Sequence, residues 1–272
     1  MGYYRVMSTK SNNNHSLSVV YATYNEEANL ARSLDSIIDL ADELIIVDGS
    51  SSDKTPDIAK KYKAKLISTT NKPIFHINKQ MAMDSATKEW TLQMDADEVV
   101  DEDMRAHIKE ILAGDISKAD DGYWLKRKNY FLGKFLTKGG QYPDPVIRFY
   151  KTGRAFLPMK SVHEQMEVKG TVGWLRGHLL HYNSPDFSVY LRKANTYTSL
   201  TAKEWFEAGK QPSFGFALQM MLIKPIVTFF MLYFRHKGLV DGFPGLVFAL
   251  FSGLHFPLAY LKLWEMRKAD KK

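Results

Sequence analysis

The chain carries Trp90-Thr91-Leu92-Gln93-Met94-Asp95-Ala96-Asp97-Glu98, a short apolar run that ends in three carboxylates. Leu92 and Met94 alternate with polar residues as in a β-strand, and the acids follow where the chain leaves the sheet. Ligands of an open α/β sheet bind at this edge. Two aspartates separated by one residue can lean toward one point, and their oxygens are the ligands that Mg²⁺ and Mn²⁺ prefer. The run therefore predicts a metal site with positions left for substrate phosphates.

The acids of this region have a second explanation. Acidic residues favour helix N-termini, and a helix is expected to start near Asp101. A solvated turn before that helix explains Asp101, Glu102 and Asp103. It does not explain Asp95, which still belongs to the strand, so a functional site is the preferred interpretation.

The composition bounds the class of protein. With 272 residues, 45% of them hydrophobic and 25% charged, the chain is expected to form one α/β domain with an appendage or two small domains. It has no cysteine, which excludes disulfides, zinc-thiolate sites and thiol nucleophiles and is compatible with a reducing cytoplasm. The net charge of +7 favours anionic partners, whether nucleotide, nucleic acid or membrane surface. Residues 1–16 are polar and are expected to be a disordered lead-in.

Strand and loop units precede the acidic run. We expect buried strands at 17–22, 43–48 and 65–68, each followed by a helix, the last over 75–88. A polar break between a buried strand and a helix is where backbone N–H groups and side chains can contact a nucleotide. The sequence contains neither Gly-x-Gly-x-x-Gly nor Gly-x-x-x-x-Gly-Lys-Ser/Thr, so the usual dinucleotide and P-loop fingerprints are missing.

Three motifs, in their order and spacing, resemble the GT-A nucleotide-sugar domain of family-2 glycosyltransferases. They are Val-Tyr-Ala-Thr-Tyr-Asn-Glu-Glu at 20–27, Val-Asp-Gly-Ser-Ser-Ser-Asp-Lys-Thr at 47–55 and Asp-Ala-Asp-Glu at 95–98. The likeness covers roughly residues 17 to 115. Within the family the chain looks most like the bacterial enzymes that build the lipopolysaccharide core. The resemblance implies a Rossmann-like α/β fold, a nucleotide-diphosphate sugar donor of the uridine type, and Mg²⁺ or Mn²⁺ as cofactor.

The resemblance also implies roles for individual side chains. The nucleotide-sugar pocket would include Thr23, Asn25, Glu26, Asp48, Asn78, Lys79 and Asp95. Within it, Asp48 would hold the uracil or ribose, Asp97 would bind the metal, and Asp95 would touch the ribose or a metal-bound water. From the residues alone, Asp48 could instead cap its turn, and Asn78 and Lys79 could lie on an exposed helix face.

Beyond Gly114 the chain alternates apolar and polar residues at 122–131 and 145–150, which resemble the acceptor-side strands of the fold. The sequence Ser-Val-His-Glu at 161–164 follows, and the family resemblance gives Glu164 the position of the catalytic base. An acceptor hydroxyl that attacks an anomeric carbon must lose its proton, so the reaction needs such a group. His163 and Glu164 could also be ordinary surface residues.

Two other polar positions are candidates. Arg148 could contact a phosphate or an acidic acceptor sugar, or be an ordinary charge at a strand edge. His178 and His181 are candidates for a further metal ligand, and His181 is preferred because it precedes a turn with Pro185.

The C-terminal region differs in character. A helix is expected over 186–209, followed by nearly uninterrupted apolar segments at 214–234 and 243–261 and a basic tail. Three placements of these segments are possible: the core of a soluble domain, two membrane-spanning helices, or a hairpin that lies in one membrane interface. Lys224 within the first segment costs about 3 kcal/mol at the centre of a bilayer, and Pro225 beside it favours a broken helix. The interfacial hairpin is therefore preferred, with basic residues reaching lipid headgroups.

The sequence predicts a chain in four parts: a lead-in (1–16), a nucleotide-sugar-binding half (17–115), an acceptor-binding half (116–185) and a helical membrane-associating region (186–272). Together with the family resemblance, which implies inversion, it predicts a metal-dependent glycosyltransferase at the cytoplasmic face of the inner membrane, with a lipid-linked or lipopolysaccharide-core acceptor and no nucleic-acid partner. A polyprenyl-phosphate acceptor is an alternative. From other classes, a haloacid dehalogenase-type phosphatase with Asp95 as nucleophile and a non-catalytic nucleotide-binding membrane protein are further alternatives.

Overall fold

The computed structural model describes residues 14–72, 76–158 and 165–270, and these form two compact units. Unit 1 consists of Met1–Arg127 and Pro145–His181, and unit 2 of Lys128–Asp144 and Tyr182–Lys272. Most of the predicted lead-in lies outside the described residues. The helical region predicted from residue 186 falls in unit 2, together with 128–144.

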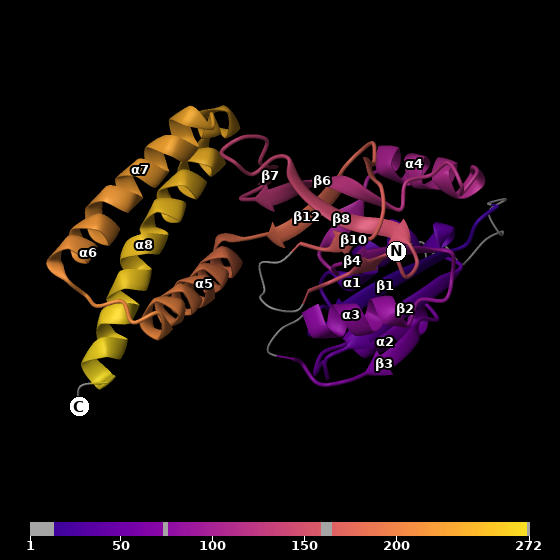
Figure 1. Ribbon diagram of the computed structural model, residues 1–272, viewed down its shortest axis with the longest axis horizontal. Coiled ribbons are helices and arrows are strands. Elements are labelled where there is room, and N and C mark those ends of the chain that lie inside the picture. Colours follow the sequence, from indigo (N-terminus) through magenta and orange to yellow (C-terminus); the bar gives the residue numbers. More distant parts are fainter. Residues whose placement is uncertain (1–13, 73–75, 159–164, 271–272) are drawn as a thin grey trace. The chain divides into compact units, whose positions relative to one another are not determined.

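The elements with residues in unit 1 alternate strands and helices in the first half (Figure 1). In chain order they are β1 (Leu17–Thr23), α1 (Leu30–Asp35), η1 (Ile38–Leu40), β2 (Glu43–Asp48), α2 (Thr55–Lys61), β3 (Lys65–Ser68), α3 (His76–Asp84), β4 (Trp90–Met94), β5 (Glu98–Val100), α4 (Glu102–Ala113), β6 (Gly122–Phe131), β8 (Asp144–Lys151), β9 (Ala155–Phe156), β10 (Glu167–Val168), β11 (Val172–Trp174) and β12 (Leu179–Ser184).

One mixed sheet organises this unit, with the strand order β3-β2-β1-β4-β8-β6-β12-β5. Strands β3, β2, β1 and β4 run parallel, and β8 is antiparallel to β4. Successive side chains of a strand point to opposite faces. Accordingly Val19 and Tyr21 of β1 pack in one apolar cluster with α1 and α4, while Val20 packs in another with α3. The predicted α/β fold is confirmed.

The chain after the acidic run differs from the expectation of a turn that leads directly into a helix. Glu98 begins β5, which pairs antiparallel with β12, so that His181 lies opposite Glu98. The helix begins at Glu102, with Asp101 as its N-cap, because the Asp101 carboxylate accepts a hydrogen bond from the Met104 backbone N–H at 2.9 Å. The extra strand fixes both ends of the acidic turn in the sheet.

Unit 2 is mainly helical. Its elements beyond the shared strands are β7 (Lys134–Phe135), α5 (Phe187–Glu207), α6 (Phe214–Leu218), η2 (Gln219–Ile223), α7 (Lys224–Phe230), η3 (Met231–Arg235), η4 (Gly238–Asp241) and α8 (Phe243–Asp270). Figure 1 shows α6 and α7 running alongside α8, with α5 on the other side of α8. The predicted helical C-terminal region is confirmed.

The two apolar segments form continuous helices rather than broken ones. The first runs over Phe214–Arg235 and the second over Phe243–Asp270, and both are long and apolar enough to cross a membrane. A wide π-helical turn over Gln219–Ile223 precedes Pro225, and such turns relieve the clash and the lost hydrogen bond that proline imposes. Pro257 likewise lies inside α8 without ending it.

Close packing holds the two apolar helices and their connecting turn. A Cβ atom on Gly253 would lie 2.7 Å from the Pro225 carbonyl oxygen, so only glycine permits this approach of α8 to α7. At the turn, the Asp241 carboxylate is almost completely buried and accepts hydrogen bonds from the backbone N–H groups of Thr137 and Lys138 at 2.9 and 2.8 Å. The turn is therefore anchored to the loop that follows β7.

Candidate active site

The predicted nucleotide-sugar residues meet at one edge of the sheet. Strands β1, β2 and β4 are parallel, and the register places Thr23 beside Asp48 and Tyr21 beside Met94. Their carboxyl ends therefore present Thr23, Asp48 and Asp95 along the same edge, as the pattern of strands and acids indicates.

Hydrogen bonds within the loops join the ends of β1 and β2. The Asp48 carboxylate accepts from the Ser51 hydroxyl at 2.6 Å, the Ser51 backbone N–H at 2.8 Å and the Thr23 hydroxyl at 3.2 Å. The Ser51 hydroxyl in turn accepts from the Asn25 backbone N–H at 2.8 Å. Asn25 and Ser50 have φ of 55° and 66°, a strained conformation for residues other than glycine. Asp48 therefore has the turn-capping role, and its contacts hold the strained loops in place.

Glu26 is also held by neighbouring residues. Its backbone N–H donates to the Thr55 hydroxyl at 2.8 Å, and its carboxylate accepts from the Asn29 side chain at 2.9 Å. The side-chain oxygen of Asn25 accepts from the Ser52 backbone N–H at 2.8 Å. The loops after β1 and β2 thus form one hydrogen-bonded layer over the sheet edge.

Asn78 and Lys79 lie on the buried face of α3 rather than on an exposed one. Their side chains are only 4% and 8% exposed. The Asn78 amide donates to the Thr70 carbonyl at 3.1 Å, while its Oδ1 atom has no hydrogen-bond partner among the described residues. The Lys79 ammonium lies 2.5 Å from Asp95 Oδ1. Burial of an acceptor without a partner is costly, so Asn78 Oδ1 is an exception among the buried polar atoms of this unit.

Asp95 lies between two buried cations. Its Oδ1 atom contacts Lys79, and its Oδ2 atom accepts from Arg148 Nη2 at 2.7 Å. Burial by itself would raise the pKa of Asp95, but Arg148 and Lys79 outweigh that effect and hold the pKa well below its usual range. Asp95 is consequently a permanent anion whose two oxygens are engaged by protein cations.

Arg148 is a structural partner of the acidic turn and not an exposed strand-edge charge. Arg148 is 8% exposed, and its guanidinium also contacts the side chains of Gln93 and Glu98. Glu98 is fully buried, and its carboxylate accepts from the Asp95 backbone N–H at 2.9 Å, while the Glu98 N–H donates to the Asp95 carbonyl at 3.0 Å. Arg127 lies 3.4 Å from the same carboxylate. The acidic turn is thereby fixed from both sides.

Asp97 and His181 are brought together at this turn. Asp97 Oδ2 lies 3.4 Å from His181 Nε2, and the two side chains are 18% and 12% exposed. A carboxylate and an imidazole are suitable ligands for Mn²⁺, and the spacing fits two neighbouring positions around one ion. Among the described residues no three His, Asp or Glu side chains are grouped closely enough to hold a metal by themselves. The donor set therefore fits an ion that takes its remaining ligands from substrate phosphates and water.

Sequence reasoning did not single out Gln93, Glu98 and Arg127 as supports of the site. The signal for Glu98 was present, because it directly follows the two aspartates of the motif. No local pattern marks Gln93 or Arg127, whose roles depend on strands that meet only in the folded sheet. The predicted base Glu164 and its neighbour His163 lie outside the described residues.

Residues 18–196 match glycosyl transferase family 2. The chain is 28% identical over 255 residues to a lipopolysaccharide core biosynthesis glycosyltransferase, LpsC, of Rhizobium meliloti, covering 92% of each chain. It is 28% identical over 269 residues to an uncharacterized glycosyltransferase of Rickettsia typhi, covering 94% of this chain and 88% of that one.

The fold has a solved counterpart in a mannosyltransferase of Pyrobaculum calidifontis, whose structure contains GDP-mannose and Mn²⁺. The two chains superpose with a TM-score of 0.52 at 15% identity, covering 93% of this chain and 88% of that one. This likeness shows a shared fold.

The ion pair between Arg148 and Asp95 leads to a stability prediction. Arg148→Met leaves Asp95 and Glu98 buried without the guanidinium, so we expect the free energy of unfolding at pH 7 to fall by about 3–5 kcal/mol. The control Arg154→Met removes a largely exposed charge and should change it by less than about 1 kcal/mol. Urea unfolding in mild detergent measures both.

The same comparison has a pH dependence. The folded-state pKa of Asp95 lies below its unfolded value of about 3.9, so the stability that it contributes is present above that pH and is lost as the pH falls. The Arg148→Met protein should therefore lose less stability than the wild type between pH 5 and pH 2. Equal losses in the two proteins would contradict the assignment of this ion pair.

Proposed function

Because the chain belongs to glycosyltransferase family 2, we propose that it transfers a sugar with inversion from a uridine-diphosphate donor to a hydroxyl group of a lipid-linked or lipopolysaccharide-core acceptor. The observation that carries the proposal is the Asp97–His181 pair, which lies beside the cluster of Asp95, Lys79 and Arg148 at the sheet edge. In this proposal Asp97 and His181 bind the metal, and the ion pairs of Asp95 support them. Both groups lie at the edge where open α/β sheets bind their ligands.

In this proposal the acceptor oxygen attacks the anomeric carbon, and the bond between that carbon and the diphosphate oxygen breaks in one displacement. Asp97 and His181 hold Mg²⁺ or Mn²⁺, which when bound supplies Lewis-acid stabilisation of the leaving diphosphate. Glu164 accepts the proton of the acceptor hydroxyl. Lys79 and Arg148 keep Asp95 ionised and its turn fixed, so that Asp97 is presented in one position.

The nucleotide lies over the loops after β1 and β2 in this proposal. Asn78 Oδ1, buried and without a partner among the described residues, accepts a hydrogen bond from the base or the ribose. Thr23, Asn25, Glu26 and Asp48 shape the pocket, with the Asp48 carboxylate acting mainly through the loop that it holds. Lys79 and Arg148 already contact the two carboxylate oxygens of Asp95. Asp95 therefore contacts the ribose or a metal-bound water only through the exposed part of its carboxylate.

The similarity to LpsC supports a saccharide hydroxyl of the lipopolysaccharide core as acceptor. A polyprenyl phosphate is the alternative, and because it is already an anion it needs no base. Membership of the family speaks against a haloacid dehalogenase-type phosphatase. Transfer from a labelled nucleotide sugar separates an enzyme from a non-catalytic nucleotide-binding protein.

We further propose that the helices of unit 2 place the protein at the cytoplasmic face of the inner membrane as an interfacial hairpin. Only 6% of the most apolar window in Phe214–Arg235 is buried within the molecule, and large side chains such as Phe214 and Ile226 are exposed. An exposed apolar surface of that kind is unusual in a soluble monomer. Lys224 is exposed near the middle of this helix, which favours the interface over the hydrocarbon centre.

The metal role of Asp97 predicts that Asp97→Asn abolishes transfer and weakens binding of the nucleotide sugar chiefly when Mn²⁺ or Mg²⁺ is present. An amide is a poorer ligand for a hard cation than a carboxylate. The control Asp103→Asn changes an exposed acid of the first turn of α4 and should leave both unchanged. Activity assays and calorimetric titrations with and without metal measure the difference. An Asp97→Asn enzyme of normal activity at saturating metal would show that this role is wrong.

The base role of Glu164 predicts that Glu164→Gln lowers the rate of transfer at least about 100-fold with donor affinity nearly unchanged, because only the proton acceptor is lost. The control Glu167→Gln alters an exposed residue of β10 and should have no such effect. Single-turnover transfer and donor titration separate rate from binding. Full activity of Glu164→Gln would favour His163 as the base or a phosphate acceptor.

The membrane placement predicts that the full-length protein sediments with membranes and is partly released by high salt or alkaline carbonate. Salt weakens the attraction between basic side chains and anionic headgroups. Fractionation followed by immunodetection measures the distribution. Release only by detergent would favour two spanning helices, and a fully soluble protein would contradict both membrane placements.

A further inference from the structure

Unit 2 contains a cavity of about 560 Å³ that no step of sugar transfer uses. Its lining comes from α5, α7, α8 and the end of β12. This volume is within the range of about 300–1,000 Å³ that is usual for sites that bind small molecules. All lining residues belong to unit 2, so the cavity is a feature of the helical region itself.

The walls of the cavity are mainly apolar. Phe251 and Phe256 of α8 contribute aromatic rings, and Leu191 and Leu258 contribute aliphatic side chains that are 42% and 45% exposed. The cavity therefore opens at a surface that is itself apolar. A wholly water-soluble ligand would leave these walls in contact with water, whereas a hydrocarbon chain would cover them.

The charged part of the lining is basic. Lys193, His255 and Lys262 line the cavity, and no aspartate or glutamate does. The Lys262 ammonium donates hydrogen bonds to neutral oxygens of α5, among them the Asn195 carbonyl at 2.7 Å and the Ser199 hydroxyl at 2.8 Å. These contacts orient the charge without neutralising it. The acid that acts on Lys262 electrostatically is Glu265, which is exposed and lies outside the lining.

Lys193, the second lysine of the lining, lies on α5, the helix whose oxygens accept the hydrogen bonds of Lys262. The Lys193 ammonium donates to the Asn183 carbonyl at 2.8 Å, and Lys193 is two residues from Asn195, which accepts from Lys262. The Lys193 ammonium is thus held at Asn183, before α5 begins, and the Lys262 ammonium at Asn195 and Ser199, near the middle of α5. Lys224, on the neighbouring apolar helix, lies 5.8 Å from the ring centre of Phe256, another lining residue. Basic residues within apolar helices are expected to mark functional sites, and Lys262 of α8 is one that lines this cavity.

We propose that this cavity binds one anionic glycerophospholipid. An acyl chain lies against the aromatic and leucine walls, the phosphate is held near Lys262, and Lys193 adds positive charge elsewhere in the same lining. Hydrocarbon walls combined with basic groups and no acid in the lining complement an amphipathic anion. The bound lipid connects α5 with α7 and α8, which both contribute to the lining. This proposal does not depend on the identity of the transferred sugar.

The test uses purified full-length protein in a non-ionic detergent, without nucleotide sugar. Short-chain phosphatidylglycerol is titrated below its micelle concentration, and binding is followed by calorimetry. We expect saturable binding of one lipid per chain, with phosphatidylcholine of equal chain length at least about tenfold weaker because its headgroup has no net charge. Glycerol phosphate, which lacks the acyl chains, should bind at least about tenfold more weakly than phosphatidylglycerol.

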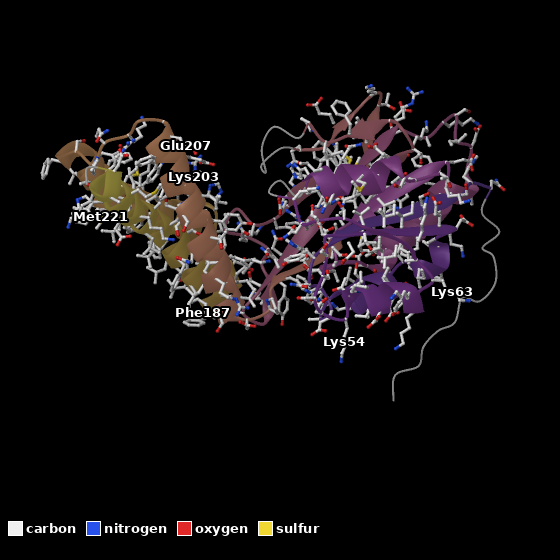
Figure 2. All side chains as sticks on the ribbon, turned by 90° about the horizontal axis from the view of Figure 1, so that it is seen from below. Lys54, Lys63, Phe187, Lys203, Glu207 and Met221 are labelled. Carbon is white, nitrogen blue, oxygen red and sulfur yellow. The ribbon has the colours of Figure 1, made fainter. Side chains whose placement is uncertain are left out.

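Two double variants locate the site. Lys193→Gln with Lys262→Gln should weaken phosphatidylglycerol binding about tenfold or more, since both lysine charges of the lining are lost. Lys203→Gln with Lys268→Gln removes the same net charge outside the cavity and should leave the affinity unchanged. Lys203 pairs with Glu207 on α5, where Figure 2 shows the two side chains together, and Lys268 lies over the Trp264 ring.

A third variant, Ala194→Phe, fills the cavity without altering charge and should also weaken lipid binding, with circular dichroism as the check that the helices persist. It carries the test if the lysine variant does not fold. The proposal would be overturned if both lysine double variants lost phosphatidylglycerol affinity equally, or if phosphatidylcholine bound as tightly as phosphatidylglycerol. Unchanged phosphatidylglycerol binding by Ala194→Phe would also overturn it. Glycerol phosphate that binds as tightly as phosphatidylglycerol would also overturn it, because the site would then recognise phosphate alone.

Discussion

The partly buried Asp95 carboxylate and its two buried cations set the main constraint on unit 1. A carboxylate removed from water is tolerated only with compensating charge and hydrogen bonds. Lys79 of α3 and Arg148 of β8 provide that charge on opposite oxygens of Asp95. Three elements must therefore meet at the end of β4 for the fold to be stable. The support of the site and the packing of the sheet are the same set of contacts.

This constraint explains the division of labour between the two aspartates of the motif. Asp95 is neutralised by protein cations, whereas Asp97 faces His181, which β12 places opposite Glu98 through its pairing with β5. The buried Glu98 carboxylate closes the turn between them by accepting the Asp95 N–H. A rigid turn lowers the reorganisation that a metal and a diphosphate would otherwise require, which is how pre-organised sites increase reaction rates.

Unit 2 differs from unit 1 because its helices expose much of their apolar surface. Its long helices expose large apolar side chains along Phe214–Arg235, and their polar contacts are concentrated at Asp241, Lys193 and Lys262. Continuity through Pro225 and Pro257 shows that the helices accommodate proline by local widening and packing. Such a surface suits the proposed contact with lipid, and the basic cavity is where we propose that one lipid is bound.

The sequence by itself determined the parallel strands, the order of polar loops after them and the acids at the end of β4, because alternation of apolar residues and the motif residues are local signals. It also indicated the apolar C-terminal helices. Only the tertiary structure decided that Arg148 pairs with Asp95, that Asn78 and Lys79 are buried, and that β5 brings His181 to Asp97. Those contacts join residues as many as 84 positions apart, from Asp97 to His181, and no local pattern encodes which distant strands become neighbours in a sheet.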